Sequence, residues 1–185
     1  GATWSIMEAG LTDVFGDDPH LGAATDDITS LGFSRLEVET MIESMMNIWA
    51  GVSGFTNLGQ VTDGNAGFGA LEANDGHLGD IRIGAISFYG PGGVLAHAYQ
   101  PGTESVFGSG GTIAGDIHID NEENWGDGTG GTLDLATVIL HEMGHALGLG
   151  HTDDTAAIMY PVYGGKNLTL GADDIAGIQA IYGAA

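Results

Sequence analysis

The segment His-Glu-Met-Gly-His-Ala-Leu-Gly-Leu-Gly-His at residues 141–151 constrains this chain more than any other part of its sequence. His141 and His145 are four residues apart, so on a helix their imidazoles lie about 40° apart around the axis and can bind one ion. Gly148 can adopt the left-handed conformation that ends a helix, which lets the chain return His151 as a third nitrogen ligand. The fold must therefore present a helix, a tight turn and a third histidine to one point.

This pattern predicts a catalytic rather than a structural zinc site. Three protein ligands leave one zinc position open for water or substrate, whereas structural zinc sites use four. Glu142 follows the first histidine, and its carboxylate can reach a water at the open position without binding the metal. It is the natural general base. The alternative is an ordinary glycine-rich surface helix, which requires chance agreement at all of these positions.

Composition excludes several other functions. The chain has 185 residues, with 25 Asp plus Glu against 3 Lys plus Arg and a formal charge of −22. A nucleic acid or an anionic membrane surface would require many cations, and no run of about 18 apolar residues is present to span a bilayer. The absence of cysteine removes disulfides and thiolate chemistry. The abundant carboxylates instead suggest hard cations such as calcium, and a saline or calcium-rich exterior.

The length and the apolar pattern predict one compact domain that contains both helices and strands. Gly1-Ala2-Thr3 lacks the basic and apolar regions of a signal peptide, so we expect a soluble, trimmed mature form. The expected strands are residues 4–7, 81–83, 94–99 and 116–120. The expected helices are 34–50, 133–147 and 173–182, the first with a Ser34–Glu37 capping box and the last with Ile175, Ile178 and Ile181 inward. Glycine-rich stretches at 51–80, 107–115 and 126–132 are expected to be loops.

The histidine segment and the residues after it resemble the metzincin signature, HExxHxxGxxH followed by a methionine turn. Ala157-Ile158-Met159-Tyr160-Pro161 would supply the turn, and Thr152, after the third histidine, is closest to the serine usual in matrixins. Further segments are similar to the matrix metalloproteinase catalytic domain: GDIRIG at 79–84, GPGGVLAHAYQPG at 90–102, GDIHIDNEENW at 115–125 and DDIAGIQAIYG at 173–183. The resemblance, to a matrixin of bacterial type, covers most of the chain beyond residue 30.

The resemblance implies an α+β metzincin fold with a small twisted mixed five-stranded sheet and three helices. An active-site cleft would separate a larger N-terminal subdomain, about 1–151, from a small C-terminal subdomain, about 152–185. It also implies a secreted, monomeric zinc endopeptidase that acts on protein or peptide substrates, with no nucleic-acid or membrane partner. Glu142 would take a proton from the attacking water and pass it to the leaving amine.

The resemblance places substrate along the strand at 94–98, by backbone hydrogen bonds. Selectivity would come from a pocket next to the zinc, where Thr137, one helical turn before His141, is small. Met159 would form the hydrophobic base beneath the zinc. The substrate-binding residues expected on this basis are Ala96, Thr137, Pro161 and Tyr163.

Calcium is the second cofactor that the resemblance implies. One matrixin calcium site maps onto the carboxylates of Asp80 and Asp116 and the carbonyls of Thr112 and Ala114. Another maps onto the carbonyls of Gly90, Gly92 and Val94 with Asp120 and Glu123, but Tyr89 stands where the family has an aspartate. The alternative for these carboxylates is plain surface acidity in a very acidic chain.

A second, structural zinc is also possible, with His97 and His118 as two of its ligands. The loop that supplies the remaining ligands in matrixins is missing here, and the substitutes His77 and Asp80 precede the third strand instead of following it. The alternative is that His97 and His118 are ordinary strand residues.

Two other classes of protein are alternatives to a matrixin, and each should differ from this sequence at one position. A serralysin-like or astacin-like protease should carry a tyrosine two residues after the methionine, where this chain has Pro161. A non-catalytic binding module on the same scaffold should have lost the general base, whereas Glu142 is present.

Overall fold

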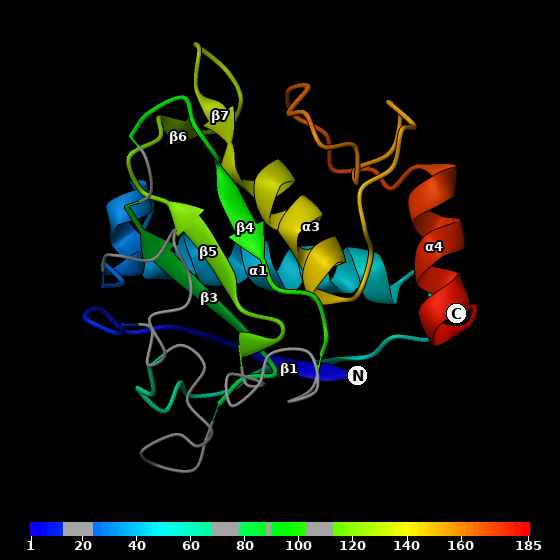
Figure 1. The fold of residues 1–185 in the computed structure, drawn as a ribbon, viewed down its shortest axis with the longest axis horizontal. Coiled ribbons are helices and arrows are strands. Elements are labelled where there is room, and N and C mark those ends of the chain that lie inside the picture. The colour runs from blue at the N-terminus through cyan, green and yellow to red at the C-terminus, as the bar shows by residue number, and fades with distance from the viewer. Residues whose placement is uncertain (13–23, 68–77, 88–89, 103–112) are drawn as a thin grey trace.

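The computed structural model describes residues 1–12, 24–67, 78–87, 90–102 and 113–185, and Figure 1 shows how their elements are arranged. The main sheet contains β1 (Ala2–Ile6), β2 (Asn57–Gln60), β3 (Ile81–Ile86), β4 (Ala96–Ala98) and β5 (Ile117–Asp120) in the order β2-β1-β3-β5-β4. Only β4 runs antiparallel to its neighbour. The described residues contain three α-helices, so the expected α+β fold with a five-stranded mixed sheet is confirmed. None of these helices is long and apolar enough to cross a membrane.

Helix α1 (Arg35–Ala50) begins and ends where the sequence predicts. The Ser34 hydroxyl accepts from the Glu37 amide, and the Glu37 carboxylate accepts from the Ser34 amide at 2.8 Å, which completes the capping box. The helix ends at Gly51. On its inner face Met45 and Met46 are buried in the core.

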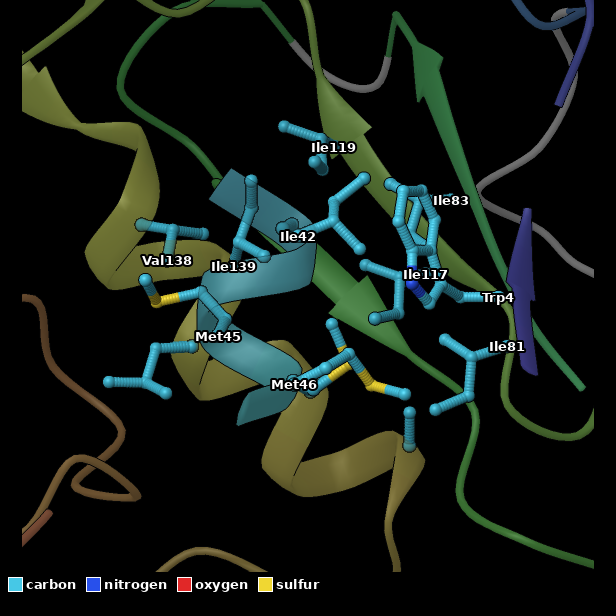
Figure 2. Packing of buried hydrophobic residues seen from close by; sticks show 14 of the residues in the cluster. Trp4, Ile42, Met45, Met46, Ile81, Ile83, Ile117, Ile119, Val138 and Ile139 are labelled. Atoms are coloured by element: carbon cyan, nitrogen blue, oxygen red, sulfur yellow. The ribbon is translucent and has the colours of Figure 1, made fainter. Parts of the chain in front are cut away.

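One apolar core lies between the sheet and the helices α1 and α3 (Leu135–Ala146). Figure 2 shows Trp4, Ile81, Ile83, Ile117 and Ile119 from the strands meeting Ile42, Met45 and Met46 from α1 and Val138 and Ile139 from α3. Trp49 of α1 adds a polar link, because its Nε1 donates to the Leu140 carbonyl at 3.1 Å. The core thus holds α3, which carries the first two histidines, firmly against α1 and the sheet.

Helix α3 begins two residues later than the sequence predicts. Leu133 and Asp134 instead form the short strand β7, which pairs in parallel with β6 (Trp125–Gly126). Asp134 then caps the helix, because its Oδ1 accepts from the Thr137 amide at 2.8 Å. An aspartate immediately before the first residue of a helix is a favoured N-cap, so Asp134 marks this helix start in the sequence.

Several expectations are wrong in detail. The stretch 51–80, expected to be a loop, contains β2, which was missed because its only apolar residue, Leu58, is 59% exposed and no alternation marks it. β2 is stabilised by pairing with β1.

The strand expected at 94–99 is only Ala96–Ala98. In α4 (Ala172–Tyr182), Ile178 is buried as expected, but Ile181 is 49% exposed because the last turn lies at the surface.

Candidate active site

Three histidines converge at the C-terminal half of α3. His141 and His145 come from successive turns of the helix, and Gly148, with a φ of 106°, turns the chain so that His151 returns toward them. The Nε2 atom of His141 lies 3.1 Å from that of His145 and 3.3 Å from that of His151, and the last two are 3.1 Å apart. The structure therefore brings together all three predicted ligands.

Backbone carbonyls set the tautomers of the two helical histidines. The Nδ1 of His141 lies 2.7 Å from the Ile158 carbonyl oxygen, and the Nδ1 of His145 lies 2.8 Å from that of Leu149. A carbonyl oxygen only accepts, so each Nδ1 carries the proton and each Nε2 of a neutral ring keeps a lone pair. Burial lowers the pKa of His141 to about 4 and also lowers that of His145, which keeps both rings neutral near pH 7.

The arrangement fits zinc. Ligands about 2.0–2.1 Å from a tetrahedral zinc lie about 3.3 Å from one another, and the three Nε2 separations agree with that spacing. Two lone pairs cannot hydrogen-bond to each other, so a cation is what explains the close approach of the His141 and His145 nitrogens. Within the described ranges, these three histidines form the only group of three such side chains whose ligand atoms all lie within 4.8 Å.

Glu142 lies next to this centre and is unusually placed for a carboxylate. Its side chain is 6% exposed, and its Oε2 has no hydrogen-bond partner among the described residues. Burial raises the pKa of Glu142 to about 8. Glu142 also lines the same cavity as His141 and His151, so its carboxylate lies where a general base for a metal-bound water would act.

Met159, expected as the base beneath the zinc, packs against the helix that carries the first two histidines. It is buried, and its sulfur contacts Gly144 in the middle of α3. The residue before it, Ile158, supplies the carbonyl that holds the His141 ring. The methionine turn therefore supports the helix and one histidine at the same time.

A cavity of about 1070 Å³ opens beside the histidines. Its lining includes His141, Glu142 and His151, and all four expected substrate-binding residues: Ala96, Thr137, Pro161 and Tyr163. Ala96 belongs to β4, one of the two edge strands of the described sheet. The cavity is therefore bounded by a strand edge, by α3 and by the segment after the methionine turn.

The wall of the cavity between α3 and residues 163–167 depends on residues that sequence reasoning missed. Asp134 Oδ1 accepts from the Thr137 hydroxyl at 2.5 Å, and that hydroxyl accepts from the Asn167 amide at 2.9 Å. The Asp134 amide donates to the Tyr163 hydroxyl at 2.8 Å, and Lys166 Nζ lies 3.3 Å from Asp134 Oδ2. Asp134 thus connects α3 to Tyr163 and Lys166. Thr137 is not only small but also links Asp134 to the Asn167 amide.

The carboxylates of the first calcium site have different surroundings. Asp80 is exposed, and its Oδ2 accepts from the amide and hydroxyl of Thr3 at 2.8 Å each. Asp116 is fully buried, its two oxygens have no hydrogen-bond donor among the described residues, and the nearest cation is Arg82 at 3.9 Å. Burial raises the pKa of Asp116 well above its usual value. Ala114 lies two residues before Asp116, and Thr112 lies outside the described residues.

Several residues expected at a second calcium site are joined by hydrogen bonds in the structure. The Gly92 amide donates to Glu123 at 2.6 Å, and Asp120 accepts from the Glu122 amide at 2.9 Å. Gly90, in the same turn, donates to Glu122 at 2.9 Å. Val94 is exposed just before β4. The glycine turn and the acidic turn after β5 therefore meet through the glycine amides, while residue 89 lies outside the described residues.

The two histidines of the possible second zinc site also face each other. His97 and His118 are directly opposite on the antiparallel strands β4 and β5, with the Nε2 of His97 3.0 Å from the Nδ1 of His118. His118 is fully buried, and burial lowers its pKa well below the usual value. His77 lies outside the described residues.

Comparisons with known proteins agree with this geometry. A family model described as Matrixin matches residues 25–183. The chain is 43% identical over 152 residues to a macrophage metalloelastase of Oryctolagus cuniculus, a match that covers 80% of this chain and 30% of that protein. It is 40% identical over 156 residues to a neutrophil collagenase of Homo sapiens, covering 81% of this chain and 30% of the relative.

A third relative, matrix metalloproteinase-20 of Homo sapiens, is 39% identical over 153 residues, which are 81% of this chain and 29% of the relative. The chain therefore spans less than a third of the length of these three curated relatives.

Proposed function

The chain belongs to the matrixin family, and on this premise we propose that it is a secreted zinc-dependent endopeptidase that hydrolyses peptide bonds in extended protein substrates. The observation that supports this most directly is the convergence of three histidine Nε2 atoms beside the buried carboxylate of Glu142, on one open cavity. Three nitrogen ligands and a free carboxylate are the parts that hydrolysis at a metal requires.

His141, His145 and His151 would hold the zinc through Nε2. When bound there, zinc would polarise the scissile carbonyl and lower the pKa of a water. Glu142 would take the proton of the attacking water and then donate it to the leaving amine, a role that its position beside His141 and His151 on the cavity allows. The Ile158 carbonyl holds the His141 ring in place during both transfers.

The substrate would bind in extended form along β4. Among the described residues β4 is an edge strand that pairs with β5, so its other edge is where a substrate backbone would hydrogen-bond. Ala96 lies in this strand, and Thr137, Pro161 and Tyr163 would form the pocket for the side chain after the scissile bond. Backbone recognition is nearly independent of sequence, so this pocket would determine selectivity.

The cleft would divide one catalytic unit into an N-terminal subdomain of about 1–151 and a C-terminal subdomain of about 152–185. Residues from both sides of this boundary line the cavity, which supports the division. We propose that the unit acts as a monomer on protein or peptide substrates.

Calcium is proposed as a structural cofactor at Asp116. A buried carboxylate without donors is costly unless a cation compensates it, and Arg82, at 3.9 Å, already pairs with Asp63 at 2.8 Å. A second calcium between the Gly90–Gly92 turn and Glu123 stays a prediction. So does a second zinc at His97 and His118.

The proposed function is tested with Glu142→Ala, measuring zinc content and hydrolysis of a peptide library. Removing a general base should lower kcat by about 10²–10⁴-fold while the chain keeps one zinc at the triad, since Glu142 is not a ligand. Asp153→Asn, an exposed carboxylate near His151, serves as the control and should keep full activity. Retained activity in Glu142→Ala, or loss of zinc with it, would contradict the assignment.

A further inference from the structure

Asp174 is a buried carboxylate that the proposed chemistry does not use. It lies in the first turn of α4, is 2% exposed, and accepts three backbone hydrogen bonds. Oδ2 accepts from the Gly171 amide at 2.7 Å, as expected for a residue that caps its own helix. The other two donors are the amides of Ile158 at 2.7 Å and Met159 at 3.1 Å, which lie outside the helix.

The peptide group between Ile158 and Met159 connects this carboxylate to the metal centre. Its N–H donates to Asp174 Oδ1, and its carbonyl oxygen accepts from the Nδ1 of His141 at 2.7 Å. Hydrogen bonds in series polarise one another. A negative charge at the N–H end makes the carbonyl oxygen more negative, and so a stronger acceptor for the His141 proton.

We propose that Asp174 is a positioning residue that orients His141 and strengthens it as a metal ligand through this single peptide group. A histidine whose N–H donates to a carboxylate is a better ligand at its other nitrogen, because the donated proton shifts electron density into the ring. Here the carboxylate of Asp174 does not bind His141 directly, because the Ile158–Met159 peptide group lies between them. This inference rests on the proposed zinc site at the triad.

The other helical histidine provides an internal comparison. His145 Nδ1 donates to the Leu149 carbonyl at 2.8 Å, and the same oxygen also accepts from Gln100 Nε2 at 2.8 Å. A second, neutral donor competes for that oxygen and weakens it as an acceptor. The two ligands therefore differ in the carbonyl that each Nδ1 donates to. The acceptor of His141 is polarised by the carboxylate of Asp174, whereas the acceptor of His145 is shared with the Gln100 amide.

The neighbouring residue Asp173 offers a matched control. It is also in the first turn of α4, so it has the same charge and a similar relation to the helix dipole, but it is exposed. Asp173→Asn and Asp174→Asn thus remove the same charge from adjacent positions. Only the second substitution removes the carboxylate that faces the Ile158–Met159 peptide.

The test compares the zinc affinities of wild type, Asp173→Asn and Asp174→Asn, by competition with a chromophoric chelator. Loss of a partner outside the ligand shell typically weakens metal binding by about 10–100-fold, and we expect about tenfold for Asp174→Asn. Asp173→Asn should bind as wild type does. Equal affinities for all three would overturn the inference, whereas a wild type that binds no zinc at the triad would instead refute the proposed function.

A second measurement needs no variant, in case Asp174→Asn does not fold. In the zinc-loaded wild type, NMR resolves the Nδ1 protons of the ligand histidines. The stronger hydrogen bond should move the His141 proton further downfield than that of His145 and slow its exchange with water. The opposite order in both chemical shift and exchange would overturn the inference.

Discussion

The sulfur of Met159 rests directly on Gly144, in the middle of the helix that carries His141 and His145. A Cβ at Gly144 would overlap that sulfur and would lie 2.9 Å from Cζ2 of Trp49. Glycine inside a helix costs about 1 kcal/mol relative to alanine. The position keeps glycine because the methionine turn and α1 both approach the helix backbone there.

Gly144→Ala should therefore destabilise the protein, although alanine is the better helix former. Overpacking costs about 1–3 kcal/mol, which exceeds the gain in helix propensity. We therefore expect the free energy of unfolding to fall by on the order of 1 kcal/mol, measured by urea unfolding. We also expect lower activity in a peptide assay. Gly177→Ala in α4 is the control, since its Cβ would meet only the end of the Leu149 side chain. A more stable Gly144→Ala with full activity would show that the packing is loose.

Removing the metal should make stability depend on the charge of Glu142. Its folded pKa, about 8, lies above its ordinary value of 4.5, so the folded state binds the proton more tightly than the unfolded chain does. Ionising Glu142 therefore lowers the free energy of unfolding. This loss is absent below about pH 4.5, grows as the pH rises, and is nearly complete at pH 8. Glu142→Gln removes the ionisable group and with it the loss of stability.

In EDTA, Glu142→Gln should therefore be more stable than wild type at pH 8, by about 4 kcal/mol, and equally stable near pH 4. Denaturant unfolding at several pH values measures this. The exposed Glu122 provides the control substitution Glu122→Gln. Parallel pH profiles for wild type and Glu142→Gln would disprove the raised pKa.

Cleavage should prefer a medium or large apolar side chain, such as Leu, Met or Phe, immediately after the scissile bond. Thr137 is small, and the cavity continues past it toward Tyr163. A peptide-library profile measures this preference directly. Selection of Asp, Lys or Gly at that position would show that the pocket has been misplaced.

Thr137→Val should loosen that pocket, because it keeps the side-chain shape but removes the hydroxyl that joins Asp134 to the Asn167 amide. We expect KM to rise about tenfold with a smaller change in kcat, since an unmade buried hydrogen bond costs about 1–3 kcal/mol. Thr40→Val, an exposed helical threonine, is the control and should leave KM unchanged.

Calcium should raise the melting temperature. It would bind the native state only, and a ligand at 100 times its Kd contributes about 2.7 kcal/mol. The effect should shrink at low pH, because burial raises the pKa of Asp116 and a protonated carboxyl no longer binds the ion. Thermal unfolding in EGTA and in millimolar calcium tests this, with Asp116→Asn expected to abolish the difference. If calcium does not change the melting temperature and each chain binds two zinc ions, stabilisation by calcium is contradicted.

Local signals in the sequence were sufficient for the helices and for the metal centre. The capping box at Ser34, the spacing of His141 and His145 and the turn at Gly148 all act within about one or two helical turns, where side-chain geometry follows directly from residue order. Strand β2 could not be predicted in the same way, because its hydrogen bonds go to β1, more than fifty residues away, and its own residues carry no alternation.

The sequence by itself predicted the ligands and the base of the proposed zinc site, since the chemistry of His141, Glu142, His145 and His151 follows from residue type and spacing. Only the tertiary structure decided what holds them. Asp174 reaches His141 through a peptide group in a different segment, and Asp134 joins α3 to Asn167 and Tyr163. Such contacts connect residues distant in the chain, and their hydrogen bonds form only when the core places α3, the methionine turn and α4 together.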